Sequence, residues 1–245
     1  MQKQRYYLLD SLRGFALINM IAYHALWDLV YIYGVEAYWY MGQGAYIWQQ
    51  AICHTFIMLS GFCFALGKKH LKRGITVFAA GLIVSAVTFI FMPSSPVRFG
   101  ILTCLGSCML IMIPLSKLFK KVPAIIGAPV SLLLFILTRG CNWGKIGAFG
   151  IKFFELPDSW YANLFTAYLG FPSPSFTSSD YFSVFPWLFL FVFGYFLYKL
   201  FGEKEKVKAI MRKGKIPVLS FLGKHSLIVY MLHQPLIYGL CMLIM

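Results

Sequence analysis

RGFALINMIAYHALWDLVY, residues 13–31, is apolar enough to cross a membrane, yet it carries Arg13, His24 and Asp28, and Asp10 precedes it. A transmembrane helix needs about 20 mainly apolar residues, so the stretch predicts one. An ionisable side chain at mid-membrane costs about 2.5–3.5 kcal/mol on insertion scales, and such side chains face protein or water instead of lipid. We therefore expect a membrane helix with one polar, functional face.

The whole chain has the composition of a membrane protein. Its 245 residues are 60% hydrophobic and 12% charged, and the mean hydropathy is +0.72, which sets it apart from soluble domains. Seven apolar runs, at about 8–32, 46–67, 74–92, 97–116, 122–138, 184–201 and 217–245, are long enough to span a bilayer. The prediction is an all-α polytopic membrane protein whose residues 1–245 form a single transmembrane domain, with a first span that is not a cleaved signal peptide.

Basic residues set the expected orientation. The net charge is +14, and Lys and Arg gather in the connections 68–73, 117–121 and 202–216. Short basic clusters between apolar runs are typical of cytoplasmic loops and not of a groove for nucleic acid. The N-terminus is therefore predicted to be cytoplasmic and the C-terminus outside. The long outer segment 139–183, rich in aromatic residues, Pro and Gly, is either an ordinary surface loop or a lid over a site.

The ionisable residues of the first span share one helix face. With Asp10 at zero and about 100° per residue, Arg13 falls at about 300°, His24 at about 320° and Asp28 at about 0°. Asp10 and Arg13 either pair to anchor the helix end or take part in catalysis. A carboxylate one turn from an imidazole fixes its tautomer and raises its basicity, so we favour His24 with Asp28 as a general base over a buried structural pair.

Other polar residues are weaker candidates for substrate binding. His54 and His233 lie within predicted spans, where packing between helices is an equal alternative. Arg98 either snorkels to the interface or binds an acidic or phosphate-bearing group. Asp180 either caps the sixth span or belongs to the site. The six cysteines lie mostly inside apolar runs, so neither a disulfide framework nor a metal site is predicted.

Five blocks resemble, in order, one family of membrane proteins. RYYLLDSLRGFALINMIAYHALWDL, residues 5–29, is similar to the R-x4-D-x2-RG opening of the membrane acyltransferases that include heparan-α-glucosaminide N-acetyltransferase and its bacterial relatives. The further blocks resemble its small bacterial branch: FIMLSGFCFALG (56–67), RFGILTCLG (98–106), GFPSPSFTSSDYFSVFPWLFLFVFGY (170–195) and FLGKHSLIVYMLHQPLIY (221–238). The resemblance covers nearly the whole chain.

The resemblance implies an acyltransferase and suggests which residues serve it. Arg5, Asp10 and Arg13 match the opening motif, and the spacing of fourteen from Asp10 to His24 is similar to the D-x2-RG…H arrangement of the broader acyltransferase-3 family, where that histidine is the proposed catalytic residue. The heparan enzyme has its catalytic histidine in the loop that enters the second span. That loop here, YWYMGQGAY (38–46), contains none.

In the implied reaction, acetyl-CoA or another acyl-CoA binds from the cytoplasm as cosubstrate, without a metal. His24, backed by Asp28, takes the proton of an attacking amine or hydroxyl, and Asn19 and Gln234 are candidate oxyanion donors. Basic side chains can bind the phosphates of CoA, although they also set topology. The expected cofactor-binding residues are Arg5, Asp10, Arg13, Lys72 and Arg73.

The implied partners are the lipid bilayer, acyl-CoA and an envelope glycan or lipid acceptor, in a bacterial plasma membrane and with no nucleic acid. A homodimer is left open. Two other functions also stay open. Intramembrane charged residues mark ion and proton pathways as well, so one is a transporter or channel for small solutes. The other is a non-catalytic membrane scaffold. The odd number of spans, without detectable pairing between halves, argues against a transporter.

Overall fold

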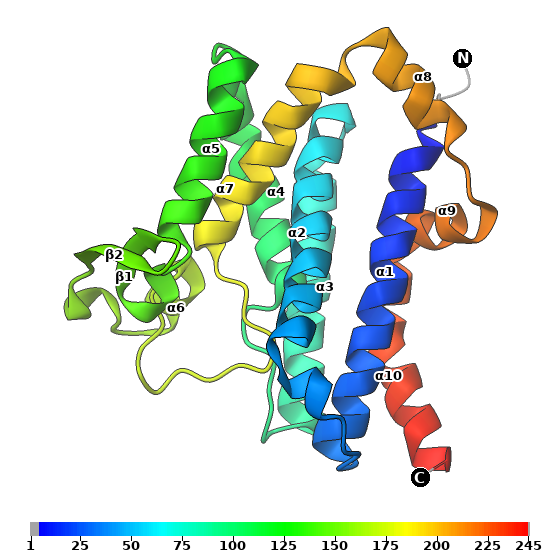
Figure 1. Ribbon diagram of the computed structural model, residues 1–245, viewed down its shortest axis with the longest axis vertical. Helices are drawn as coiled ribbons and strands as arrows, with labels where there is room; N and C mark the ends of the chain where they lie inside the picture. Colours follow the sequence, from blue (N-terminus) through cyan, green and yellow to red (C-terminus); the bar gives the residue numbers. More distant parts are fainter. Residues whose placement is uncertain (1–4, 245) are drawn as a thin grey trace. The chain divides into compact units, whose positions relative to one another are not determined.

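Seven helices dominate the chain, as the apolar runs predict. The computed structural model describes residues 5–244. Among these residues, seven helical segments are long and apolar enough to cross a membrane: Tyr7–Ile32, Gln43–Leu66, His70–Phe91, Ile101–Phe119, Ala124–Trp143, Val184–Gly202 and Ser226–Ile244. This confirms a polytopic α-helical membrane protein (Figure 1).

The chain folds as two compact units. The first, which we call the terminal unit, contains residues 1–59 and 202–245, and the second, the central unit, contains residues 60–201. Helix α2 (Gln43–Leu66) contributes its first part to the terminal unit and its last turns to the central unit.

In the terminal unit, helix α1 (Tyr7–Trp27) packs against the C-terminal segment of the chain. This segment contains α8 (Glu205–Lys213), α9 (Pro217–Lys224) and α10 (Ser226–Ile244). Figure 1 shows α10 beside the second half of α1. A short 3-10 turn (Tyr38–Met41) precedes α2. An apolar cluster of Leu17 and Met20 from α1 with Ile52 from α2 forms the core of this unit.

The seventh span is confirmed but is shorter than the predicted run 217–245, because this segment contains two helices and the span is the second, Ser226–Ile244. Helix α9 ends at Lys224, and the amide of His225 closes it by donating to the carbonyls of Phe221 and Leu222. The reason is the close packing of α9 on α1, where a Cβ placed on Gly223 would lie 1.8 Å from the carbonyl oxygen of Asp10. Glycine permits this backbone contact, and the chain turns directly after it before continuing as α10.

The central unit is built around two buried helices, α4 (Ile101–Phe119) and α7 (Val184–Leu197). The first eight residues of α4 are all buried, and so are ten residues of α7. Helix α3 (His70–Phe91) packs on α4, and α5 (Ala124–Thr138) packs on α7. A π-turn (Tyr198–Gly202) ends α7, and there the Lys199 ammonium donates to the carbonyls of Phe119 and Val122, at 2.9 Å each.

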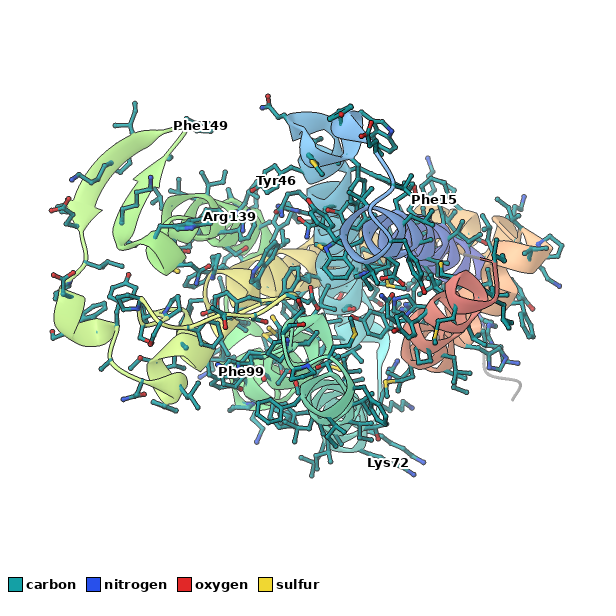
Figure 2. All side chains as sticks on the ribbon, turned by 90° about the horizontal axis from the view of Figure 1, so that it is seen from below. Phe15, Tyr46, Lys72, Phe99, Arg139 and Phe149 are labelled. Atoms are coloured by element: carbon teal, nitrogen blue, oxygen red, sulfur yellow. The ribbon has the colours of Figure 1, made fainter. Side chains whose placement is uncertain are left out.

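Segment 139–183 has more structure than the all-α prediction allows. Strands β1 (Lys145–Ala148) and β2 (Ile151–Glu155) form an antiparallel hairpin with a bulge after Ile146. Phe149 at its tip is 92% exposed, and Figure 2 shows it at the end of the hairpin. A six-residue helix, α6 (Leu164–Leu169), begins with a capping box at Asn163.

Hydrogen bonds hold the 139–183 segment onto the helices of the central unit. The Tyr168 hydroxyl donates to Ser107 Oγ of α4 at 2.6 Å. The Asn142 amide donates to the carbonyl of Gly170 at 2.8 Å and to Ser183 Oγ at 3.0 Å. The Tyr168 bond therefore joins the segment to α4, whereas the two Asn142 bonds tie distant parts of the segment to each other.

Candidate functional site

Four polar side chains meet between α1 and α10 inside the terminal unit. His24 belongs to α1, Asp28 opens the π-turn Asp28–Ile32 that follows it, and His233 and Gln234 belong to α10. We call these four residues the α1–α10 polar cluster. Gln234 Nε2 donates to Asp28 Oδ1 at 2.6 Å, and the His24 and His233 rings lie 5.0 Å apart between centroids. The polar face of the first span thus meets polar groups of the last.

Asp28 is the most deeply buried member of the cluster, with 0% of its surface exposed. Its Oδ1 accepts the Gln234 hydrogen bond, whereas Oδ2 has no hydrogen-bond partner among residues 5–244. A buried carboxylate oxygen without a partner is costly, so it marks either a ligand position or a strained structural site. The backbone widens here, because the amide of Tyr33 donates to the Asp28 carbonyl five residues back. Single π-turns of this kind occur frequently at functional sites.

The expected hydrogen bond between His24 and Asp28 is not formed in the described part of the chain. The Gln234 amide meets Asp28 instead, and the His24 ring packs on His233 and edge-on against Tyr23. The carboxylate thus pairs with an amide from α10, at 2.6 Å, and not with the imidazole one turn earlier in its own chain segment. A charge-assisted bond of this kind is about twice as strong as one between neutral groups.

His233 has a defined tautomer in this arrangement. Its Nδ1 lies in hydrogen-bond contact with the carbonyl of Tyr230. A carbonyl only accepts hydrogen bonds, so Nδ1 carries the hydrogen, and in the neutral imidazole Nε2 then carries the lone pair. His233 is 7% exposed, and its Nε2 has no partner within the described residues.

At the other end of α1, the opening-motif residues form an ion-pair group. Arg5 Nε lies 2.6 Å from Asp10 Oδ2, and Arg13 Nη1 lies 3.5 Å from Asp10 Oδ1. Arg13 also approaches the carbonyl of Gly223 in α9 at 3.5 Å. The Arg13 side chain is 19% exposed and that of Arg5 is 38% exposed. Arg13 therefore serves the α1–α9 contact, whereas Arg5 remains accessible to a phosphate group.

Asn19 and His54, two further candidates of the terminal unit, make hydrogen bonds to residues outside the α1–α10 polar cluster. The Asn19 amide nitrogen donates to the carbonyl of Phe15 at 2.9 Å, and its oxygen accepts from the Trp48 indole at 3.0 Å. Asn19 thus lies on the α2 side of α1, away from the helix face that carries His24. His54 Nδ1 is in hydrogen-bond contact with the carbonyl of Gln50 in the same helix.

The remaining candidates lie in the central unit. Lys72 and Arg73 are exposed in the first turn of α3, and Lys72 projects outward in Figure 2. Arg98 precedes α4 and does not open the fourth span, which begins at Ile101. Its backbone amide and carbonyl both pair with the hydroxyl of Ser178, at 2.9 Å each.

Asp180 caps α4 and not the sixth span, which corrects the first alternative drawn from the sequence. Its Oδ2 accepts from the amide of Ile101, the first residue of α4, at 3.3 Å. Burial raises the pKa of the Asp180 carboxyl to about 6, and the hydrogen bond from Ile101 offsets part of this rise. Within its unit, Asp180 joins the 176–183 segment to the start of a buried helix.

The sequence left packing and a site role as equal alternatives for His233, and the structure places this residue in the α1–α10 polar cluster. The adjacent pair His233–Gln234 in an apolar run was the available signal, but its importance depends on α10 lying against α1. Among residues 5–244, no group of three or more His, Cys, Asp or Glu residues could hold a metal ion.

A comparison with family models matches nearly the same part of the chain as the five similar sequence blocks. A family model described as heparan-alpha-glucosaminide N-acetyltransferase, catalytic, matches residues 5–235. This range includes the ion-pair group of α1 and the whole α1–α10 polar cluster. No curated protein and no solved structure matches the chain.

Proposed function

We propose that this chain, which belongs to the heparan-alpha-glucosaminide N-acetyltransferase catalytic family, transfers an acetyl group from acetyl-CoA to an amine or hydroxyl of an envelope sugar or lipid. Membership indicates a transmembrane acetyltransferase, and the family in general uses acetyl-CoA as donor. The observation that carries the proposal is the α1–α10 polar cluster: two imidazoles beside a fully buried carboxylate, with buried polar atoms that lack partners among the described residues.

In the proposed reaction, His24 acts as the general base. The acceptor nitrogen or oxygen attacks the thioester carbonyl, a bond forms to the acetyl carbon, and the proton of the acceptor moves to the imidazole. The carbon–sulfur bond breaks, its electron pair leaves with the CoA sulfur, and the sulfur takes up the proton. General-base catalysis of this kind contributes about 10²–10⁴-fold. Asp28, one turn from His24, supplies negative charge that favours the imidazolium.

The proposed donor site lies at the other end of α1. Arg5 is the more exposed of the two arginines at this end, at 38% against 19% for Arg13, so its guanidinium can meet a CoA phosphate while it also pairs with Asp10. Lys72 and Arg73 of the central unit are exposed cations of the same kind. We propose that this end faces the cytoplasm of a bacterium and that the acceptor is reached at the outer side, because the basic connections are typical of cytoplasmic loops.

The test is acetyl transfer by the purified full chain in detergent. Acetyl-labelled acetyl-CoA is the donor, glucosamine is the probe amine, and hydrolysis gives the background. His24→Ala is expected to lower transfer by about 100-fold or more. His225→Ala is the control, since its ring contacts only Phe221 among the described aromatic rings. Equal activity of His24→Ala and wild type, or solute flux in proteoliposomes without acetyl-CoA binding, would contradict the proposal.

A further inference from the structure

The α1–α10 polar cluster contains a second imidazole that the proposed reaction does not yet use. His233 lies on a different helix from His24, yet the two rings are tilted by 56° at a centroid distance of 5.0 Å. The His24 ring contacts the rings of Tyr23, its neighbour in α1, and of His233 from α10, and Asp28 follows one helical turn later.

A general base works best when one of its nitrogens is held by an acceptor, so that the other nitrogen points its lone pair at the substrate. The sequence suggested Asp28 for this role, but Asp28 Oδ1 accepts from Gln234 instead. No hydrogen bond to either His24 nitrogen is present within the described residues, so the orientation of its ring depends on its neighbours.

His233 carries the acceptor that His24 needs. Its Nδ1–H is held by the Tyr230 carbonyl, which leaves the lone pair on Nε2. This Nε2 is buried and has no partner among residues 5–244, and its ring lies 5.0 Å from the His24 ring between centroids. A buried lone pair without a partner is a position at which a donor is missing.

We propose that His233 is the positioning residue of His24. Its Nε2 accepts one N–H of the His24 ring, directs the other His24 nitrogen at the acceptor, and stabilises the imidazolium when the proton arrives. Gln234 supports this arrangement by holding Asp28, so the two adjacent residues of α10 orient the two functional residues of the first span. The inference rests on the proposed function, and it names the group that makes His24 an effective base.

Two variants of His233 isolate the position of the acceptor atom. In His233→Gln the side-chain amide reaches as far as Nε2, so its oxygen can accept from His24. In His233→Asn the amide ends at the level of Nδ1, where it can still donate to the Tyr230 carbonyl but falls short of His24. Both replacements are neutral amides, but only His233→Asn keeps a group at the level of Nδ1 for the Tyr230 carbonyl.

The experiment measures kcat and KM for acetyl-CoA with glucosamine as probe amine, on full-length protein in detergent. His233→Asn is expected to lower kcat by about 10- to 100-fold, the usual effect of losing an orienting partner, with KM changed by less than about threefold. His233→Gln is expected to restore most of the lost kcat. A purely structural role through the Tyr230 contact would predict at least as large a loss in His233→Gln as in His233→Asn.

The outcomes separate the inference from the function on which it rests. Wild-type activity in both variants, or equal loss in both, would overturn the role of Nε2 while leaving His24 as the base. Absence of acetyl transfer by the wild-type chain would overturn the proposed function, and the inference with it. A kcat loss confined to His233→Asn supports the inference.

Discussion

The contact between α9 and α1 predicts opposite effects for the same substitution at two glycines of the terminal unit. A Cβ on Gly223 would lie 1.8 Å from the Asp10 carbonyl oxygen, whereas a Cβ on Gly239 in α10 would have no atom within 4 Å. In Gly223→Ala, α9 would have to move by about 1.2 Å (3.0 minus 1.8) before it reached even 3.0 Å, the limit below which Cβ atoms are essentially never found. The obstacle is backbone, so no side chain can turn aside.

The size of the effect follows from two opposing terms. Overpacking destabilises a folded protein by about 1–3 kcal/mol, or more where backbone must move. Replacing Gly by Ala in a helix stabilises it by about 1 kcal/mol. Gly223→Ala should therefore destabilise the protein by about 2 kcal/mol, which lowers Tm by roughly 4–8 °C for a chain of this length. Gly239→Ala should raise Tm slightly, because the added methyl group meets no neighbouring atom and only the higher helix propensity of Ala acts.

Thermal unfolding in detergent, followed by circular dichroism or by the fluorescence of a thiol probe, measures both variants under the same conditions. Gly14→Ala provides an independent check from the facing helix, since its Cβ would lie 2.0 Å from the Leu219 carbonyl oxygen. If Gly223→Ala melted at the same temperature as Gly239→Ala, the close backbone contact of α9 with α1 would be refuted.

Three further predictions follow from single contacts. In wild type, the free energy of unfolding should fall by about 2–3 kcal/mol as pH rises from about 4 to 6, because burial raises the pKa of the Asp180 carboxyl from 3.8 to about 6 and ionisation is therefore unfavourable in the folded state. Asp180→Asn should remove this fall, because an amide does not ionise. The melting curves of the two proteins should coincide below about pH 4 and diverge above pH 6. Lys199→Met should destabilise the central unit by about 1.5–3 kcal/mol, because two carbonyls at the α4–α5 turn lose a charged donor; unchanged denaturant midpoints would contradict this. Asp28→Asn should lower acetyl transfer less than His24→Ala does, since one amide oxygen can still accept from Gln234; an equal loss would assign Asp28 a direct chemical role.

The predictable part of the fold is the part set by local sequence. Length and apolar character identify the membrane helices, because crossing a bilayer depends on the residues of one segment. The helical period also places Asp10, Arg13, His24 and Asp28 on one face. The structure shows members of this face in contact with α9 and α10.

The rest depends on contacts between distant residues. The helix break at His225 follows from the close packing of Gly223 against α1. This contact cannot be recognised from residues 217–245 alone. The partner of Asp28 is 206 residues away, and Asp180 caps a helix whose first residue is 79 positions earlier. Sequence reasoning therefore identified His24 and Asp28 as members of a polar site but assigned the wrong hydrogen-bond partner to Asp28.

The most direct test of the account separates acetyl-CoA binding from the chemical step. Acetyl-CoA affinity and the single-turnover rate of acetyl transfer to glucosamine are measured for wild type and His24→Ala at saturating protein. We expect the affinity of His24→Ala for acetyl-CoA to change by less than about threefold while its transfer rate falls by about 100-fold or more, because the base acts on the acceptor and not on the CoA phosphates. An unchanged single-turnover rate in His24→Ala would show that acetyl transfer does not depend on this imidazole.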